Sequence, residues 1–577
     1  MSEPLVPPPE RDLLETPDLY GAYPRLSEVQ VKGLCQQGDV QRVAAGDVLF
    51  RSGERPDACY VVLEGTVGEV DGEAAHQRLL AVHGPRRFLG EIGLLTGRPV
   101  FLGAVALRQG TVLRVPLAAL RDMVGSDPAL GDLILRAYLL RRPLQLQLGV
   151  GLRIIGSRFS PDSRRLREFA ARNRIPHRWI DLERDEAADQ LLAGLGVVPE
   201  HTPIVIWQGC RVLRNPSNAE LARLLGLRPL SPLRQLADLV VVGAGPAGLA
   251  AAVYGASEGL QTVVFDGVAT GGQAGTSPRI ENYLGFPAGI SGGELAERAS
   301  LQASKFGARI ILPAEAKGLG REQGCYVVNV DGAENVHTRA VVLATGAHYR
   351  RLQVPGLDEL EPSSVYYAAT EAEANLCRGD PVVIVGGGNS AAQATLFLAR
   401  SAASVTLVVR GDRLDSDMSR YLADRLTRTA GVEVRLRTVV KKLLGSESLE
   451  GIAVEDVATK ICAELPARAL FVFIGAQPRS DWLAGSLALD DSGFVLTGQA
   501  IDQRQDGANQ YPTPPLADAA TGSNADSRRA FLETSWSGVY AVGDLRSGSI
   551  KRVASAVGEG AMAVRFVHQY LASIGAS

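Results

Sequence analysis

The sequence predicts a multidomain protein in which an all-β section is followed by three α/β sections, and three observations support this. The chain has 577 residues, of which 46% are hydrophobic and 21% charged, a composition typical of a globular protein with several domains. Residues 24–125 alternate short apolar runs with Gly, Asp and Pro turns, which favours short strands. A strand-like run followed by a glycine loop and a helix-like run occurs at 239–266 and again at 381–410.

Charge and hydropathy exclude several classes of protein. Sixty basic and 63 acidic residues give a formal net charge of −3, which argues against a dominant nucleic-acid surface. No apolar run approaches the roughly 18 residues that a membrane-spanning helix needs. The N-terminal stretch MSEPLVPPPERDLLETPD is acidic and Pro-rich and does not resemble a signal peptide. We therefore expect a cytoplasmic protein.

The six cysteines are scattered singly along the chain. The closest pair is 24 residues apart, so the sequence contains no Cys-x-x-Cys and neither a zinc ribbon nor a dithiol motif is expected. We predict buried or inert thiols and no metal site. The positions are Cys35, Cys59, Cys210, Cys325, Cys377 and Cys462.

The pattern of predicted strands and helices indicates two N-terminal domains, a linker and an insertion. The all-β section, together with a helical pattern at 128–141, forms a first domain at 24–141. Residues 151–227 alternate strands with helices expected at 162–174, 185–194 and 218–226, and form a small α/β domain. Residues 227–235 are expected to be a linker, and the polar segment 503–529 a surface insertion.

The first glycine loop has the pattern of a Rossmann-type dinucleotide site. In LVVVGAGPAGLAA, Gly243 permits a tight turn, Gly245 lets the backbone approach a pyrophosphate, and Gly248 lets helix and strand pack closely. The helix N-terminus supplies free N–H groups for phosphates. Asp266 lies 23 residues after the first glycine, where an acid binds a ribose diol.

The stretches ATGGQAGTSPRIENYLGFP, VVLATGAHYRRLQVPG and GVYAVGDLRSGSIKRVASAVGEG follow this loop in order. Together with it they resemble the low-molecular-weight thioredoxin reductase flavoproteins over roughly 237–575. The resemblance implies an FAD domain at 237–362 and 484–577, and a homodimer. It also implies flavin contacts from Gly271, Gly272, Gln273, Asn282, Thr345, Gly346, Gly543, Asp544, and a helix start at Lys551, Arg552 and Val553.

The second glycine loop, in VVIVGGGNSAAQA, indicates a nicotinamide domain, placed at 363–483. Its residues are Gly386, Gly388, Asn389, Ser390 and Ala391, the G-x-G-x-x-A variant of the pattern. The next strand ends at Arg410 instead of an acid, and Arg413 follows; an arginine here neutralises the 2′-phosphate of NADP. NADPH is therefore expected over NADH, and an arginine on a solvated loop is the alternative reading.

The family carries a redox-active Cys-Ala-Thr-Cys between these motifs, and this chain does not. The same frame reads Ala368-Ala369-Thr370-Glu371, so Ala368 and Glu371 occupy the cysteine positions. Thiol–disulfide exchange requires a thiolate, which neither side chain supplies. We expect no catalytic side chain here, with the chemistry carried out by the flavin, and we expect Cys377 to be buried or inert.

The small α/β section resembles a glutaredoxin-like thioredoxin fold, again without its thiols. Where that fold has Cys-Pro-x-Cys, the chain reads Ser160-Pro161-Asp162-Ser163. Thr202-Pro203 matches the position of the cis-proline that the fold carries beside its site. Both dithiol positions are thus empty in one chain.

The N-terminal section, with AAGDVLFRSGERPDACYVVLEGTVGEV and FLGEIGLLTGRPVF, resembles a cyclic-nucleotide-binding β-roll. In that family a Glu holds the ribose, which Glu91 matches, and an Arg pairs with the cyclic phosphate. The Arg position falls at or next to Val100, and Arg98 is the nearest charge. Without this charge-assisted contact we expect the fold without ordinary cyclic-nucleotide binding.

The leading hypothesis is an NAD(P)H-dependent FAD oxidoreductase that passes electrons to an external acceptor, for example a ferredoxin-type carrier. One alternative is a thioredoxin-disulfide reductase that uses the cysteines of a partner. The other is a non-enzymatic redox or ligand sensor that uses FAD structurally.

Overall fold

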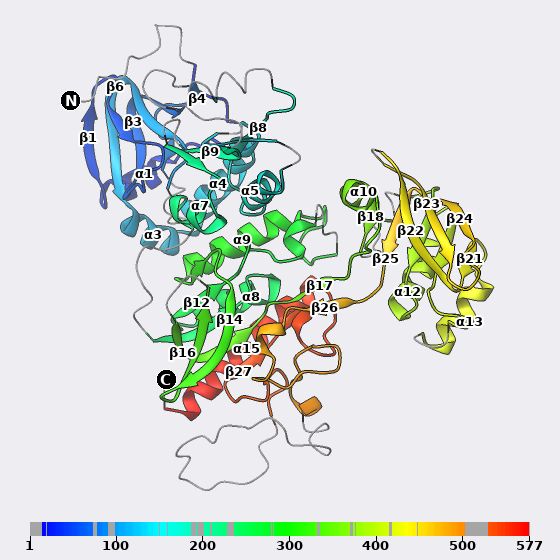
Figure 1. The fold of residues 1–577 in the computed structure, drawn as a ribbon. Helices are drawn as coiled ribbons and strands as arrows, with labels where there is room; N and C mark the ends of the chain where they lie inside the picture. Colours follow the sequence, from blue (N-terminus) through cyan, green and yellow to red (C-terminus); the bar gives the residue numbers. More distant parts are fainter. Residues whose placement is uncertain are drawn as a thin grey trace. The chain divides into compact units, whose positions relative to one another are not determined.

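The structure is a computed structural model, and it describes residues 14–18, 20–72, 78–90, 99–148, 150–157, 160–185, 192, 201–207, 211–227, 236–277, 280, 282–331, 335–367, 369, 373–374, 377–414, 418–446, 448–501 and 529–575. The chain forms two compact units (Figure 1). The first comprises Met1–Gly275, Ala296–Val342 and Gly560–Ser577, and the second Thr276–Leu295 and Leu343–Glu559. The sequence-predicted helix at 185–194, most of the linker and nearly all of the 503–529 insertion lie outside the described residues.

An antiparallel β-roll begins the first unit, as the alternating apolar pattern predicts. Its sheet order is β1-β6-β3-β4, with β2 on β6 and β5 on β3; two apolar clusters form its core, and Glu69, His83 and Arg87 are also buried. The elements are α1 (Glu28–Cys35), β1 (Asp39–Val43), β2 (Val48–Phe50), β3 (Ala58–Asp71), β4 (Arg78–His83), β5 (Phe88–Leu89), β6 (Gly103–Pro116), α3 (Leu117–Ser126) and α4 (Pro128–Leu148). Helix α4 extends the predicted 128–141 by about two turns.

A second module follows, in which one sheet has the order β10-β9-β7-β8. Strands β7 and β8 are parallel, and β9 is antiparallel to both β7 and β10. Helix α5 turns Leu166, Phe169 and Ala170 into the core at helical spacing. The elements are β7 (Leu152–Gly156), α5 (Pro161–Arg172), β8 (His177–Asp181), β9 (Ile204–Trp207), β10 (Arg211–Arg214) and α7 (Asn218–Leu224).

The rest of the first unit is built on a sheet with the order β13-β12-β11-β16-β15-β14. Strands β11, β12 and β13 are parallel, and β11 and β12 are nearly fully buried, whereas β14 and β15 form an antiparallel hairpin. The elements are β11 (Ala237–Val242), α8 (Pro246–Ser257), β12 (Thr262–Phe265), α9 (Gly292–Lys305), β13 (Arg309–Ile311), β14 (Ala316–Glu322), β15 (Cys325–Val330), β16 (Val336–Leu343) and α15 (Val553–Ser573).

The second unit contains a parallel sheet with the order β18-β25-β19-β20-β21, and a separate antiparallel sheet β22-β23-β24 packed on it through one apolar cluster. The elements are β17 (Ala347–Tyr349), α10 (Leu357–Ser364), β18 (Val365–Tyr366), β19 (Pro381–Val385), α12 (Asn389–Leu398), β20 (Ser404–Val408), α13 (Arg420–Arg428), β21 (Val432–Arg435), β22 (Thr438–Gly445), β23 (Leu449–Asp456), β24 (Cys462–Pro466), β25 (Ala469–Val472), β26 (Ala476–Pro478), β27 (Val539–Ala541) and η5 (Gly543–Leu545).

Helices α8 and α15 approach each other so closely that only glycine fits between them. A Cβ placed on Gly560 of α15 would lie 2.1 Å from the carbonyl oxygen of Ala247, in the first turn of α8. Two residues earlier, Gly558 is exposed on the same helix, and a Cβ there would meet nothing within 4 Å. Gly560 therefore has no room for a side chain, whereas Gly558 on the same helix does.

Gly560→Ala should lower the unfolding midpoint, because the added methyl group forces the two helix backbones apart at a cost of about 1–3 kcal/mol. Gly558→Ala is the matched control and should raise the midpoint slightly, since alanine in an exposed helix interior is favoured over glycine by about 0.5–1 kcal/mol. Urea unfolding of the full-length variants measures both. Equal effects of the two substitutions would contradict the close approach.

Candidate functional site

The first glycine loop lies between β11 and α8, and its glycines allow a tight turn and close packing of the backbone. Gly243 has a φ of 108°, and its N–H donates to the carbonyl of Phe265 at 2.7 Å. A Cβ on Gly248 would lie 1.8 Å from the carbonyl oxygen of Gly243. The turn and the helix packing that the sequence predicts for these two glycines are therefore both present in the first unit.

A second glycine pair lies against this loop. The N–H of Gly271 donates to the carbonyl of Ala244 at 2.7 Å, and a Cβ on Gly272 would lie 3.1 Å from the Cα of Gly245. Gly271 and Gly272 have φ values of 100° and 53°, so both positions favour glycine. These two stretches of backbone, separate in sequence, pack directly against each other.

Asp266 directly follows β12, at the position where the sequence predicts a ribose-binding acid. Its Oδ2 accepts from the N–H of Ala244 at 2.9 Å, and its Oδ1 accepts from the N–H groups of Val268 and Ala269 at 2.9 and 3.2 Å. The carboxylate therefore connects the first glycine loop to the turn that leads to Gly271 and Gly272. This fastening role was not evident in the sequence.

The first turn of α8 has unused hydrogen-bond donors. Gly245 is its N-cap and provides no side-chain cap, and the first turn contains no acidic residue. By contrast, α1, α5 and α7 begin at serines whose side chains accept from the helix amides. Free amides and the helix dipole suit an anion such as a pyrophosphate. The loop residues thus fit the dinucleotide that the sequence predicts.

The second unit repeats this arrangement in the loop between β19 and α12. Gly388 is the N-cap of α12, again without a side-chain cap or an acidic first turn. A Cβ on Gly386 would lie 2.4 Å from the carbonyl oxygen of Phe473 and 3.0 Å from the Cβ of Ala391, which is fully buried. The chain therefore holds two helix N-termini of the same kind, each following a buried parallel strand.

The side chains around the second loop divide into structural and exposed ones. Asn389 Oδ1 accepts from the N–H of Ser419 at 2.7 Å and so joins the loop to the start of α13. The side chains of Ser390, Arg410 and Arg413 are exposed. Arg410 follows Val409, the first residue after the end of β20.

At the flavin end predicted from the motifs, the second unit contains a buried ion pair that the sequence did not reveal. Glu559 Oε2 accepts from the N–H of Gly543 at 2.7 Å, and its Oε1 pairs with Arg546 at 2.6 Å, with exposed side-chain fractions of 12% and 9%. This pair fixes η5, which carries Asp544. The partner of Glu559 precedes it by 13 residues, so no local sequence pattern indicates this pair.

Burial raises the pKa of the Asp544 carboxyl above its ordinary value; the positive charge of Lys551 opposes this rise, and Glu559 adds to it.

The remaining residues predicted at the flavin end are placed as follows. Lys551 places its Nζ 4.5 Å from the ring centre of Phe494, and α15 begins at Val553, with Arg552 exposed just before it. Thr345 and Gly346 bond to the backbone of Arg479. Asn282 and Gln273 are exposed, each in its own unit.

The frame that replaces the family's cysteines lies mostly outside the described residues, since of 368–371 only Ala369 is described. Cys377 is 2% exposed within the core of the nicotinamide sheet, and its Sγ donates to the carbonyl of Glu373 at 3.1 Å. Burial raises the pKa of this thiol to about 11. Cys377 is therefore buried and inert, as predicted.

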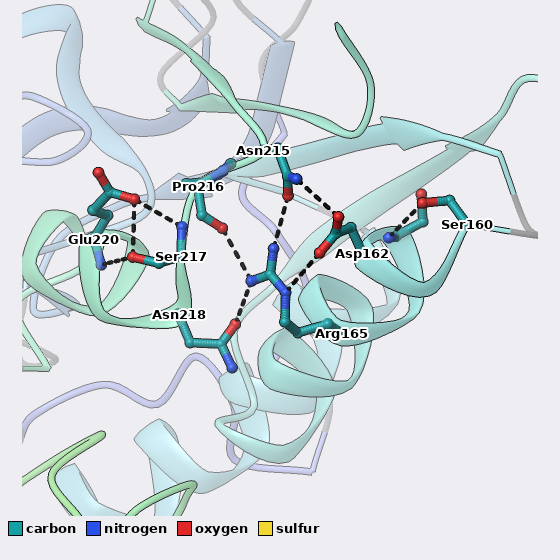
Figure 2. A network of polar contacts seen from close by, with 9 residues as sticks. Ser160, Asp162, Arg165, Asn215, Pro216, Ser217, Asn218 and Glu220 are labelled. Atoms are coloured by element: carbon teal, nitrogen blue, oxygen red, sulfur yellow. Dashed lines mark hydrogen bonds and ion pairs between the residues drawn. The ribbon is translucent and has the colours of Figure 1, made fainter. Parts of the chain in front are cut away.

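The corresponding position of the second module is filled by polar contacts within the module (Figure 2). Ser160 caps α5 by accepting from the N–H of Ser163, and the Ser163 side chain is fully buried beside Pro203, whose peptide bond is cis. Arg165 donates to Asn215 and Asn218 and pairs with Asp162. These contacts hold the start of α5 to the turn before α7.

In the β-roll, Val100 is 3% exposed within the apolar core, so this position has no charge to offer a phosphate. Glu91 and Arg98 lie outside the described residues. Across the described part of the chain, no group of His, Cys, Asp and Glu side chains could hold a metal ion. In that same part, no helix combines the length and apolarity needed to cross a membrane.

Comparison with known proteins agrees with this geometry. Residues 237–505 match the family described as Pyridine nucleotide-disulphide oxidoreductase, and residues 40–127 match the Cyclic nucleotide-binding domain. Thioredoxin reductase of Mycolicibacterium smegmatis is 32% identical over 343 residues, covering 59% of this chain and 99% of that protein. A 34.2 kDa protein in the rubredoxin operon of Clostridium pasteurianum is 29% identical over 334 residues, covering 58% of this chain and 97% of the relative.

A thioredoxin reductase structure from Streptococcus pyogenes covers 59% of this chain and 99% of its own, with 27% identity and a TM-score of 0.48. From the family matches and the near-complete coverage of relatives above 30% identity, the chain belongs to the thioredoxin reductase-like pyridine nucleotide-disulphide oxidoreductases, NAD(P)H-dependent flavin enzymes that use FAD and NADPH, and it carries a cyclic nucleotide-binding domain before the flavoprotein.

Proposed function

We propose that this enzyme oxidises NADPH and passes the electrons to an external acceptor, without an internal dithiol. The observation that carries the proposal is the pair of glycine-started, side-chain-free helix N-termini of α8 and α12. One such site binds one dinucleotide, so two sites suit a bound FAD and an exchanging nicotinamide nucleotide. When bound, FAD supplies hydride transfer and single-electron transfer.

The residues of the chain hold and orient these groups. The first turn of α8 and the Gly271–Gly272 backbone would bind the pyrophosphate, and Asp266 would accept from the ribose. Asp544, held in place through Glu559, would accept from the ribityl hydroxyls, and the start of α15 supplies a positive helix end. Arg410 would pair with the 2′-phosphate of NADPH.

The external acceptor follows from the state of the thiols. Each NADPH oxidised to NADP⁺ releases two electrons, which reduce either one disulfide or quinone, or two one-electron carriers. Internal exchange needs two neighbouring thiols, and the sequence contains no cysteine pair closer than 24 residues. Cys377, the nearest cysteine to the vacated frame, is buried and largely protonated. The electrons therefore leave to another molecule.

We further propose that residues 151–227 form a glutaredoxin-like module that lost its redox function. The mixed sheet β10-β9-β7-β8 and the cis peptide before Pro203 support the fold assignment. Ser160 and Ser163 stand at the two thiol positions, and Ser160 now serves as a helix cap. A hydroxyl does not take part in thiol–disulfide exchange, so the module has a structural or binding role.

A second candidate, reduction of a disulfide with the help of a partner's cysteines, is favoured by the names of the relatives, several of which are thioredoxin reductases. The two candidates differ in the acceptor and not in the NADPH half-reaction. A sensor without turnover differs from both, because it would not oxidise NADPH.

Anaerobic addition of NADPH to the purified yellow protein should bleach the flavin absorbance, and Arg410→Ala should weaken this response. Loss of one charge-assisted contact costs about 1.5–3 kcal/mol, which raises KM for NADPH about 10-fold to 100-fold and leaves KM for NADH unchanged. Stopped-flow reduction at several concentrations of each nucleotide measures both values. An acceptor screen then includes a rubredoxin, because one relative is named after a rubredoxin operon.

Arg400→Ala is the matched control, since Arg400 is an exposed arginine in the turn after α12, between β19 and β20 of the same domain. It should leave both KM values unchanged. No bleaching with either nucleotide would refute the oxidoreductase and favour the sensor. Rapid reduction of a small disulfide by the enzyme alone would refute the absence of an internal dithiol route.

Cys377→Ala should leave the NADPH oxidation rate and the FAD content unchanged. With a pKa of about 11, roughly one Cys377 in a thousand is a thiolate at pH 8, and the side chain is buried. Cys462→Ala removes an exposed thiol for comparison. A rate that falls only in the Cys377 variant, at full FAD content, would restore a catalytic role to this thiol.

Cyclic AMP and cyclic GMP should leave the thermal midpoint unchanged, because Val100 offers no charge to a cyclic phosphate. A ligand present at about 100 times its dissociation constant would stabilise the native state by about 2.7 kcal/mol, which a thermal scan detects. Added FAD is the positive control. A concentration-dependent rise with either cyclic nucleotide would show that another residue replaces the missing arginine.

A further inference from the structure

One carboxylate, Glu297 of α9, is the meeting point of three parts of the first unit. The hydroxyl of Tyr138 donates to its Oε1 at 3.0 Å, and Arg142 Nε lies 3.7 Å from the same oxygen. Arg174 Nε lies 3.0 Å from Oε2. The arginine contacts have ion-pair distances without hydrogen-bond angles, so the attraction is chiefly between charges.

The partners of Glu297 come from both N-terminal modules. Tyr138 and Arg142 lie on α4, the helix after the β-roll, and Arg174 follows α5 of the second module. Arg142 also donates to the carbonyl of Arg174, and Asn173 Nδ2 donates to the carbonyl of Val268 at 3.1 Å. At this junction the two modules therefore contact each other, and they also contact helix α9 and the turn after Asp266.

Helix α9 in turn contacts the loop that contains Gly271 and Gly272. Ala296, next to Glu297, lies so close to that loop that a Cβ on Gly271 would be 2.7 Å from the Cβ of Ala296. The N–H of Gly271 bonds to Ala244, and the N–H of Gly275 to the carbonyl of Gly271, at 2.7 and 2.8 Å. A displacement of α9 is therefore transmitted to the Gly271–Gly272 backbone, because close-packed groups leave no slack.

The opposite side of the junction reaches the β-roll segment that follows residues 91–98. The guanidinium of Arg142 lies 5.3 Å from the ring centre of Phe101, and that ring meets Trp207 edge to face at 5.6 Å. Phe101 belongs to the apolar core of the second module, although it precedes β6 of the β-roll. The guanidinium of Arg142 thus contacts both Phe101 and Glu297.

Burial makes this junction sensitive to its charge balance. The side chains of Arg142 and Glu297 are 5% and 11% exposed, and Arg142 Nη1 is buried without a hydrogen-bond partner among the described residues. Two guanidinium groups share one carboxylate, so removing that negative charge would leave two poorly hydrated cations side by side. The contacts between Glu297 and the two arginines therefore form in this one geometry or not at all.

We propose that Glu297 is a positioning residue through which the two N-terminal modules set the conformation of the Gly271–Gly272 loop. A change at Phe101 reaches the loop through Arg142, Glu297 and α9, so the β-roll regulates the flavin site without touching it. The inference rests on the proposed function in one respect, namely that the Gly271–Gly272 loop lies along FAD.

Glu297→Gln, Arg142→Gln and the double variant test this coupling in the full-length protein. Hydrogen exchange at the amides of Gly271 and Gly275 should accelerate at least about fivefold in each single variant, the lower limit of typical couplings between protein sites. The dissociation constant of FAD and the flavin midpoint potential should shift as well. The double variant should change these quantities by less than the sum of the single changes, because both substitutions break the same contact.

Glu322→Gln, which removes an exposed carboxylate from β14, is the charge-matched control and should alter none of these readouts. Arg174→Lys keeps the positive charge and should retain most of the wild-type exchange rate. A lower thermal midpoint with unchanged exchange, FAD affinity and midpoint potential would refute the positioning role. If exchange responds as expected in flavin-free protein but NADPH reduces nothing, the proposed function fails and the coupling stands.

Discussion

The unsatisfied amides at the start of α8 are the constraint on which the flavoprotein part depends. Helices α1, α5 and α7 satisfy first-turn amides with a serine side chain, whereas α8 begins at Gly245, has no side-chain cap and so suits an external anion. The need for close backbone approach then selects glycine at 243, 248, 271, 272 and 560, because a side chain at any of these positions would collide with backbone or lose an unusual φ. Binding and packing impose the same residue choice.

The local part of this design is readable from the sequence, and the distant part is not. The glycine spacing and Asp266 lie within a single strand–loop–helix–strand unit, so their pattern predicts both the fold and the loop geometry. Glu559 and Arg546 escape sequence reading, since a Glu in a helix is ordinary until the partner is known. Glu297 escapes for the same reason, as its partners lie more than 120 residues earlier.

The thiol positions show how far a family pattern extends. In the second module the helix that would present a thiol is intact, and Ser160 has become its cap while Arg165 joins it to the turn at Asn215. Under the proposal that this module is glutaredoxin-like, its fold would persist without its reaction chemistry, and its surfaces could serve another purpose. The vacated frame at 368–371 differs in charge as well as in thiols, since Glu371 replaces a cysteine.

A purpose for the retained module follows from where its contacts are made. Arg174 and Asn173 lie at the end of α5, away from the serines at its start, and they contact α9 and Val268 of the flavoprotein part. A module that donated electrons would need its active end to face the flavin, whereas a module that transmits position needs only rigid contacts. The buried charges at Glu297 supply such contacts, because their geometry changes only at a high cost in desolvation. Under the two proposals made above, the absence of both dithiols and the presence of this junction agree with one another: the N-terminal modules would act on the flavin site through position and not through electron transfer.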